Sequence, residues 1–149
     1  MNVSELAVRE SVRDTVFAYA EAGDRLRLDD LAATFIETGV LEVADGWRAE
    51  GRQAIRQALD RPGPDPEGAR GGGPSRRRPR YVRHFVTNLR FVTVTEAEVH
   101  TTAYFQVITD VGPDHWGRYR DVLVPSDGRW LFRERYVRVD GSAPGSLFS

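Results

Sequence analysis

The stretch RYVRHFVTNLRF, residues 80–91, places a histidine in the middle of an apolar, strand-like run. Side chains alternate between the two faces of a strand, so Val82, His84 and Val86 share one face. The other face receives Tyr81, Arg83, Phe85 and Thr87. A face with two valines is expected to be buried or to line a cavity, and a buried imidazole needs partners for both ring nitrogens. His84 is therefore either a structural residue with satisfied hydrogen bonds or the reactive group of a pocket.

Three further strand-like segments follow this stretch toward the C-terminus. They span residues 97–109, 117–124 and 129–139, and Asp127-Gly128 marks the turn before the last of them. Residues from about 140 onward are expected to form a tail. Upstream, residues 61–80 (RPGPDPEGARGGGPSRRRPR) contain too many prolines and glycines for a regular element. We expect this segment to be a flexible insertion within a single domain, 1–149.

The residues before this insertion favour helices. An apolar stripe with a helical period predicts a helix over 4–22, with Ser4 as its N-cap and Gly23 as its stop. The next elements are a short helix from Asp29, a hairpin over 38–50 that turns at Asp45-Gly46, and a helix over 51–60. Helices followed by a mostly antiparallel sheet predict an α+β fold. Such a sheet, strongly curved, can wrap around the first helix and leave a pocket at its open end.

Composition excludes several classes of protein. The chain has 149 residues, 40% of them hydrophobic, which suits one domain with a substantial core. The absence of cysteine excludes disulfides, thiolate nucleophiles and Cys-based zinc sites. A net charge of −1 argues against general nucleic-acid binding, and no apolar run is long enough to span a membrane. The charged start MNVSELAVRESVRD is unlike a signal peptide, so we expect a cytoplasmic protein.

The three histidines of the chain lack the spacing of metal ligands. His100 lies in a strand-like segment, where a surface or packing role is expected. His115 lies in GPDHWGR, which is expected to be an exposed turn. No glycine-rich loop follows a strand as a nucleotide site requires, and no nucleophile elbow is present. We therefore expect neither a metal nor any other cofactor.

Several segments resemble the SnoaL-like family of the nuclear-transport-factor-2-like superfamily. VFAYAEAGDRLRLDDLAATF resembles its first two helices and EGRQAIRQAL its third, while RHFVTNLRF, GRYRDVLV and DGRWLFRERYV resemble its sheet strands. The resemblance covers roughly residues 5–138, with 61–80 as an insertion. It implies a cone-shaped fold in which a curved, mainly antiparallel sheet wraps around N-terminal helices. This fold hosts dehydratases, polyketide cyclases, isomerases and non-catalytic binding subunits, so the fold alone does not fix the function.

A narrower resemblance, to the scytalone dehydratases and hexachlorocyclohexane dehydrochlorinases of this superfamily, concerns two residues. These cofactor-free lyases use a His–Asp pair in which the aspartate follows the first helix and the histidine opens a strand. Asp24 and His84 match those positions, whereas the second pocket histidine of the dehydratases corresponds to Thr109. The resemblance implies that His84 is a catalytic base and Asp24 its partner. An imidazole accepts protons near neutral pH, and a carboxylate on its other nitrogen stabilises the imidazolium that forms.

Five aromatic residues are candidates for a substrate pocket: Tyr19, Phe35, Trp47, Tyr104 and Tyr119. Any of them can equally belong to the core, because large aromatic side chains dominate core packing. Tyr19 is favoured because it lies about one helical turn before Asp24 and can point the same way. From there its hydroxyl can stabilise an oxyanion that develops on the substrate.

The sequence and the resemblance together predict a cofactor-free enzyme in which His84 removes a proton from a mostly apolar substrate, such as a polycyclic polyketide or other secondary metabolite. Dehydratase, cyclase and isomerase outcomes remain open, because they share this first step. The alternative is a non-catalytic small-molecule-binding or assembly module of the same fold. Phe85, Leu89 and Phe91 alternate on one strand face and predict a homo-oligomer, most simply a dimer.

Overall fold

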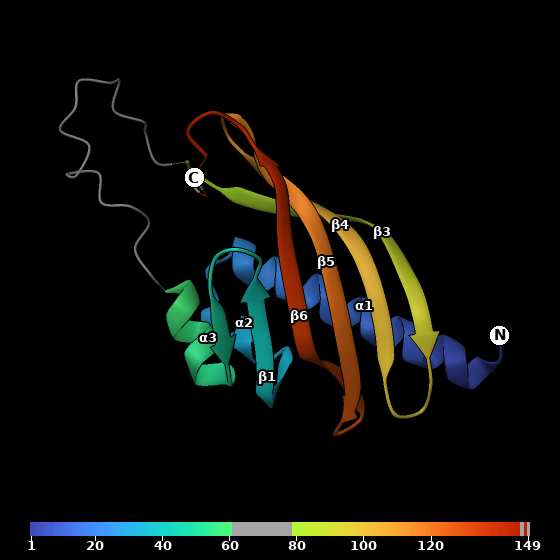
Figure 1. Cartoon of the computed structure of the whole chain (residues 1–149). Coiled ribbons are helices and arrows are strands. Elements are labelled where there is room, and N and C mark those ends of the chain that lie inside the picture. Colours follow the sequence, from blue (N-terminus) through green and yellow to red (C-terminus); the bar gives the residue numbers. More distant parts are fainter. Residues whose placement is uncertain (61–78, 147, 149) are drawn as a thin grey trace, which may run out of the picture.

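The strand that carries His84 is an edge of a six-stranded curved sheet (Figure 1). The structure is a computed structural model that describes residues 1–60, 79–146 and 148. Most of the predicted insertion, residues 61–78, therefore lies outside the described residues. The strand order is β2-β1-β6-β5-β4-β3. The strands are β1 (Phe35–Val43), β2 (Arg48–Glu50), β3 (Val82–Val94), β4 (Val99–Thr109), β5 (Gly112–Ser126) and β6 (Arg129–Ser142).

All neighbouring strands of the sheet run antiparallel except β1 and β6, which run parallel. Phe35 of β1 pairs with Phe132 of β6, which joins the first strand of the chain to the last. A mainly antiparallel sheet was predicted, and this is confirmed, but the parallel pairing of β1 with β6, the second and third strands of the order, was not foreseen. The hairpin that turns at Asp45-Gly46 connects β1 to β2 as predicted.

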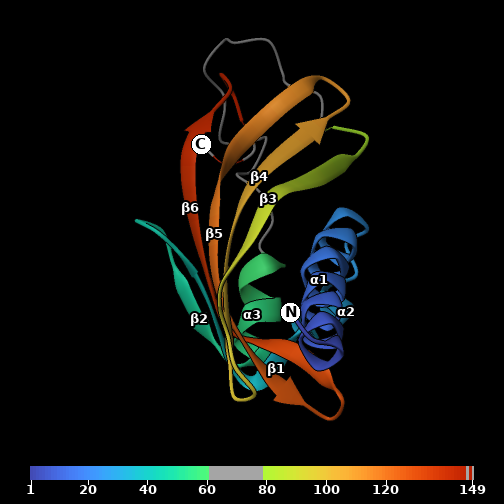
Figure 2. The same ribbon diagram turned by 90° about the vertical axis from the view of Figure 1, so that its right-hand side faces the viewer.

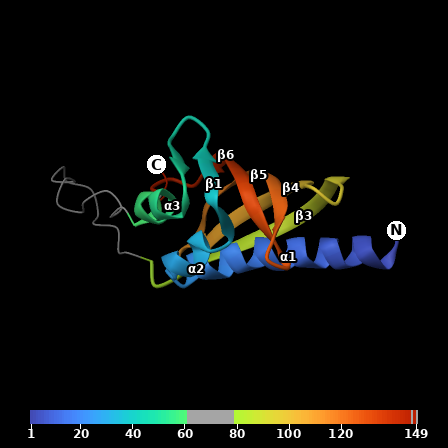
Figure 3. The ribbon, with the colours of Figure 1, turned by 90° about the horizontal axis from the view of Figure 1, so that it is seen from below.

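Within the described part of the chain, three helices precede β3: α1 (Val3–Asp24), α2 (Leu28–Ala32) and α3 (Arg52–Leu59). Helix α1 lies across one face of the curved sheet, as Figures 2 and 3 show from two sides. It buries Val12, Val16 and Tyr19 against β3 and β6 in a core that also includes Phe35 and Phe132. No helix of the described residues is long and apolar enough to cross a membrane.

Helix α1 begins and ends outside the predicted limits. Its N-cap is Asn2, whose side-chain oxygen accepts a hydrogen bond from the backbone N–H of Glu5, so Ser4 is not the cap. Gly23 lies inside the helix, and the chain leaves it at Leu26, which has a φ of 55°. The N–H of Leu26 donates to the carbonyl of Gly23, and the N–H of Arg27 donates to the carbonyl of Ala22. This pattern is typical of an α-helix that ends with one residue in the left-handed conformation.

Two strand limits also differ from the prediction. β5 begins at Gly112 rather than near residue 117, so the supposed exposed turn around His115 is part of the sheet. β6 continues to Ser142, so the C-terminal tail begins later than predicted. In both places glycine and proline suggested loops, but an antiparallel hairpin can accommodate these residues near its open end.

Strand β3 keeps the predicted alternation only in its first half. Val82 and Val86 contact the core, as expected, and Phe85 points outward with 54% of its surface exposed. Asn88 then adopts a φ of 54°, and the pairing with β4 shifts between Thr87 and Arg90. This bulge turns Leu89 and Phe91 toward the core, so the prediction that they share a face with Phe85 is wrong.

Candidate functional site

The end of α1 meets the start of β3 in a carboxylate–imidazole pair. Nδ1 of His84 lies 2.6 Å from Oδ1 of Asp24, although the two residues are 60 positions apart in the chain. The backbone N–H of His84 also donates to both carboxylate oxygens of Asp24, at 2.9 and 3.2 Å. The side chains keep 23% and 12% of their surface, respectively. The carboxylate is thus held by the strand, and the imidazole is oriented by the carboxylate.

This geometry favours one arrangement of protons on the ring of His84. A carboxylate beside Nδ1 favours the tautomer that carries its proton there, which leaves the lone pair of Nε2 available. Nε2 has no hydrogen-bond partner among the described residues. The pair can therefore accept a proton at Nε2, and Asp24 can stabilise the positive charge that results.

Three of the five candidate aromatic residues, Tyr19, Phe35 and Tyr119, lie together in the core. Tyr19 contacts Phe35 and Tyr119 edge-on, with ring centroids 6.1 and 6.3 Å apart. Burial raises the pKa of Tyr19, and likewise that of Tyr119, so both hydroxyls keep their protons at neutral pH. The Asp24 carboxylate also contributes to the raised pKa of Tyr119.

The other two candidate aromatic residues lie elsewhere. Tyr104 points outward from β4 with 55% of its surface exposed, because odd-numbered residues of this strand face the core. We therefore leave it out of the site. Trp47 is half-buried in the hairpin between β1 and β2 and packs against the edge of the core.

A buried ion pair lies beside the tyrosines and was missed in the sequence. Nε and Nη2 of Arg135 each donate to Asp121 at 2.8 Å, and both side chains have no exposed surface. The guanidinium carbon lies 4.3 Å from the ring centroid of Tyr19 and 3.9 Å from that of Tyr119. Burial opposes the charge of Arg135, but Asp121 outweighs it and raises the pKa. One signal was present, since Tyr119 and Asp121 alternate on the same face of β5.

His115, which was predicted to be exposed, is largely enclosed. Its side chain keeps 12% of its surface, and its Nδ1 lies 2.7 Å from Oδ2 of Asp114. The prediction failed because Gly112 and Pro113 suggested a turn, whereas both belong to β5. His100 pairs with Glu98 at 2.8 Å and remains at the surface, as expected.

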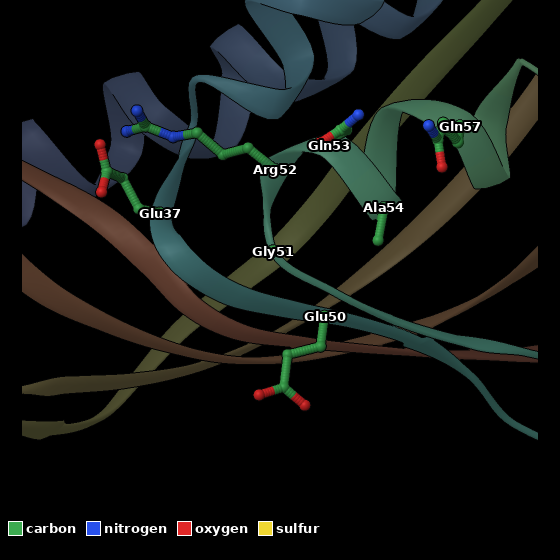
Figure 4. Close-up of a pocket in the computed structure, with 7 residues that line it drawn as sticks. All are labelled: Glu37, Glu50, Gly51, Arg52, Gln53, Ala54 and Gln57. Carbon is green, nitrogen blue, oxygen red and sulfur yellow. The ribbon is translucent and has the colours of Figure 1, made fainter.

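Two hollows on the surface lie away from the His84–Asp24 pair. One, of about 640 Å³, surrounds the start of α3 (Figure 4) and is lined by Glu37, Glu50, Gly51, Arg52, Gln53, Ala54 and Gln57. The other, of about 530 Å³, lies over the sheet and is lined largely by outward-facing residues such as Arg120, Glu134 and Tyr136. Within the described residues, no group of three or more His, Cys, Asp or Glu side chains could hold a metal ion. The chemistry of Asp24 and His84, rather than the size of a hollow, identifies the candidate site.

Comparisons with known proteins identify the family and agree with the fold. A model of the SnoaL-like domain matches residues 4–136. A putative scytalone dehydratase from Novosphingobium aromaticivorans has a similar structure, with a TM-score of 0.76 and 23% identity, over 96% of this chain and 91% of that one. ActVI-ORFA from Streptomyces coelicolor is similar with a TM-score of 0.69 and 24% identity, over 89% of this chain and 96% of that one.

A third similar structure contains a small molecule. It comes from Catenulispora acidiphila, is in complex with S-DNPA, and has a TM-score of 0.70 and 26% identity over 91% of this chain and 95% of that one. The comparison with curated proteins finds no match. The structural likenesses show the fold, and the family model covers nearly the whole chain.

Proposed function

Because the chain belongs to the SnoaL-like domain family, we propose that it is a cofactor-free enzyme that removes a proton from a mostly apolar, ring-containing metabolite. The observation that carries this proposal is the contact of 2.6 Å between Nδ1 of His84 and Oδ1 of Asp24. A histidine that is oriented in this way by a carboxylate is a typical general base. Similar proteins include one named a putative scytalone dehydratase and one that holds the small molecule S-DNPA, and both agree with a small-molecule site.

The proposed reaction begins at the free nitrogen of His84. Nε2 takes a proton from a carbon next to a carbonyl group, and the electron pair of the broken C–H bond is delocalised onto the carbonyl oxygen. Asp24 accepts the Nδ1 proton in a hydrogen bond and stabilises the imidazolium. Tyr19 is the proposed donor to the developing oxyanion, since burial keeps its hydroxyl protonated. Elimination of water, ring closure and isomerisation all proceed from this common intermediate.

A second candidate function is a non-catalytic module that binds a small molecule or takes part in an assembly. The two surface hollows favour this candidate, because neither includes His84 or Asp24 among its lining residues. The two functions differ in one measurable respect. Only the enzyme needs the basicity of His84, whereas a binding module tolerates its replacement by a residue of similar size.

The test uses exchange of the acidic C–H protons of 2-tetralone, a two-ring ketone, for deuterium in D₂O, followed by NMR. His84→Ala should lower the exchange rate at saturating ketone by about 10²–10⁴-fold, because the general base is lost. Asp24→Asn should keep the fold and also lower the rate strongly, because an amide favours the wrong tautomer of His84. The two losses should not add in the double variant, since the residues act as a unit.

His100→Ala is the matched control, because His100 also pairs with a carboxylate but lies at the surface. It should exchange 2-tetralone at the wild-type rate. All variants are compared by circular dichroism to show that they are folded. A His84→Ala variant that is folded, binds 2-tetralone and exchanges its protons as fast as the wild type would support the binding module instead.

A further inference from the structure

A second histidine lies in the same row of the sheet as His84. In the register of the sheet, Val107 of β4 pairs with His84 of β3 on one side and with His115 of β5 on the other. Neighbouring strands are roughly 4.8 Å apart, so the backbones of these histidines are about 9.5 Å apart. Residues in one such row point to the same face of the sheet. The two imidazoles therefore flank Val107 on one face.

That face is the one that α1 covers. Val107 is 1% exposed and belongs to the core, and Val82 and Val86 beside His84 pack against the same core. On β5, Gly117 and Tyr119 continue the alternation that starts at His115, and both are buried. His115 therefore also points toward the interior, on the other side of Val107 from His84. Its imidazole ring and the ring of Phe105 meet edge to face, with centroids 5.8 Å apart.

Contacts around His115 hold its ring in one orientation, as Asp24 does for His84. Oδ2 of Asp114 lies 2.7 Å from Nδ1 of His115, and the hydroxyl of Ser146 donates to the same carboxylate oxygen at 2.7 Å. Phe148 stacks on the imidazole with ring centroids 4.6 Å apart. Nε2 of His115, like that of His84, has no hydrogen-bond partner among the described residues. These two histidine–carboxylate pairs on the inner face of the sheet, unlike His100–Glu98 at the surface, each leave Nε2 without a partner among the described residues.

The charge of His84 affects the pKa of His115. Burial lowers the pKa of His115, Asp114 partly offsets this, and a positive charge on His84 lowers the pKa further. Among the described residues, the groups found to act on His115 are Asp114 on its own strand, His84 across the row, and the uncharged rings of Phe105 and Phe148. A positive charge on His84 therefore favours the neutral form of His115.

We propose that His115 is a second proton-transfer residue of this site and exchanges a proton with an oxygen of the substrate while His84 takes the proton from carbon. This inference rests on the proposed function and adds a residue that transfers a proton to the substrate's carbonyl oxygen, beside the hydrogen bond that Tyr19 is proposed to donate to it. A merely structural histidine would need only its Nδ1 contact with Asp114. The second dyad in the same row, with its own free nitrogen, is the observation that carries the proposal.

The step balances for the enolisation of a ketone. The C–H bond breaks and its proton goes to Nε2 of His84, while its electron pair forms the new C=C bond. The π pair of the carbonyl moves to oxygen, which takes the Nε2 proton of the His115 imidazolium. The enol, an imidazolium at His84 and a neutral imidazole at His115 result, and the reverse transfers restore both residues. Because burial lowers the pKa of His115, its neutral form is favoured, and in that form its Nε2 takes the proton of the enol oxygen in the reverse step.

The experiment compares His115→Gln with the matched control His100→Gln in the exchange of 2-tetralone protons. His115→Gln should lower the maximal exchange rate by about 10²-fold, the lower limit for a general acid or base, and should leave KM almost unchanged. His100→Gln should behave as the wild type. If His84→Ala abolishes exchange while a folded His115→Gln retains the wild-type rate, this inference fails and the proposed function stands. If neither variant lowers the rate, both fail.

A second measurement does not depend on activity or on the folding of the His115 variant. NMR titration of the histidine rings in His84→Gln should show a higher pKa for His115 than in the wild type, because the repelling charge has been removed. His100→Gln should leave that pKa as it is. An unchanged pKa of His115 in His84→Gln would mean that the two rings do not share a site and would overturn the inference.

Discussion

Arg135 and Asp121 place a full pair of opposite charges in the protein core. Both side chains have no exposed surface, and Nη1 of Arg135 lacks a hydrogen-bond partner among the described residues. The rings of Tyr19, Tyr119 and Phe132 surround the guanidinium with centroid distances of 3.9 to 4.3 Å. The pair therefore fixes the positions of two tyrosines near the candidate site. Its effect on stability depends on whether one charge or both are removed.

We predict that Arg135→Met lowers the free energy of unfolding by about 3–5 kcal/mol, because Asp121 is then left buried without its partner. The double variant Arg135→Met/Asp121→Leu should be more stable than this single variant by at least about 2 kcal/mol. Denaturation in urea measures both values. The surface pair Arg118–Asp140 is the control, since its side chains are 50% and 37% exposed. Arg118→Met should change stability by less than about 1 kcal/mol.

The candidate site shows which residue-level features the sequence could predict. The inward orientation of His84 could be predicted from the alternation of side chains along the strand, because Val82 and Val86 lie two residues away on either side. The contact between Asp24 and His84 did not follow from the residues, since nothing local relates positions 60 residues apart. It followed from the family resemblance. Asp121 and Arg135 were missed because charged residues on strands usually face solvent, and only their pairing inside the sheet makes their burial tolerable.

At the scale of elements, the end of α1 determines where Asp24 lies. The helix ends in a left-handed turn at Leu26, a conformation that costs a residue with a side chain roughly 1–2 kcal/mol. Leu26 is 77% exposed, so its side chain contributes little packing there. The sequence misplaced this end because Gly23 suggested an earlier stop. The glycine expected at the left-handed position is absent, and the last turn of the helix is instead held to β3 by the hydrogen bonds between Asp24 and His84.

Leu26→Gly should therefore stabilise the protein, by about 0.5–1 kcal/mol, since glycine adopts this backbone conformation without strain. Thermal and urea unfolding measure the change. Arg25→Gly is the control at the neighbouring position, where φ is −97° and glycine offers no advantage. That variant should lose stability, by about 0.5–1 kcal/mol. Equal effects of the two substitutions would show that strain at Leu26 is not the cause.

At the scale of the whole molecule, helix α1 covers only one face of the sheet (Figure 2). On the other face, Phe85, Tyr104 and Trp116 lie on three adjacent strands and are 54%, 55% and 40% exposed. We call these three residues the outer aromatic patch. It replaces the predicted patch, because the bulge at Asn88 removes Leu89 and Phe91 from this face. The register explains the new grouping, since Gln106 of β4 pairs with both Phe85 and Trp116.

We expect the outer aromatic patch to mediate association with a second copy of the chain. Sedimentation velocity at micromolar concentration should show a dimer for the wild type and a monomer for Phe85→Glu/Tyr104→Glu, because buried charges oppose an apolar contact. Val111→Glu is the control. Val111 is 75% exposed but lies in the turn that connects β4 to β5, outside the outer aromatic patch. It should remain a dimer. A monomeric wild type would refute the expectation.

The parallel pairing of β1 with β6 has a consequence for the order of events during synthesis. Phe35 leaves the ribosome long before Phe132, its partner in the sheet. Until β6 has been synthesised, the side of β1 that will pair with it has no partner. Pairing across so long a stretch of chain is slow, because the loop must close before its contacts form. The early helices and the first hairpin must therefore wait, exposed to chaperones and to other nascent chains. Truncated chains that lack β6 should aggregate rather than fold.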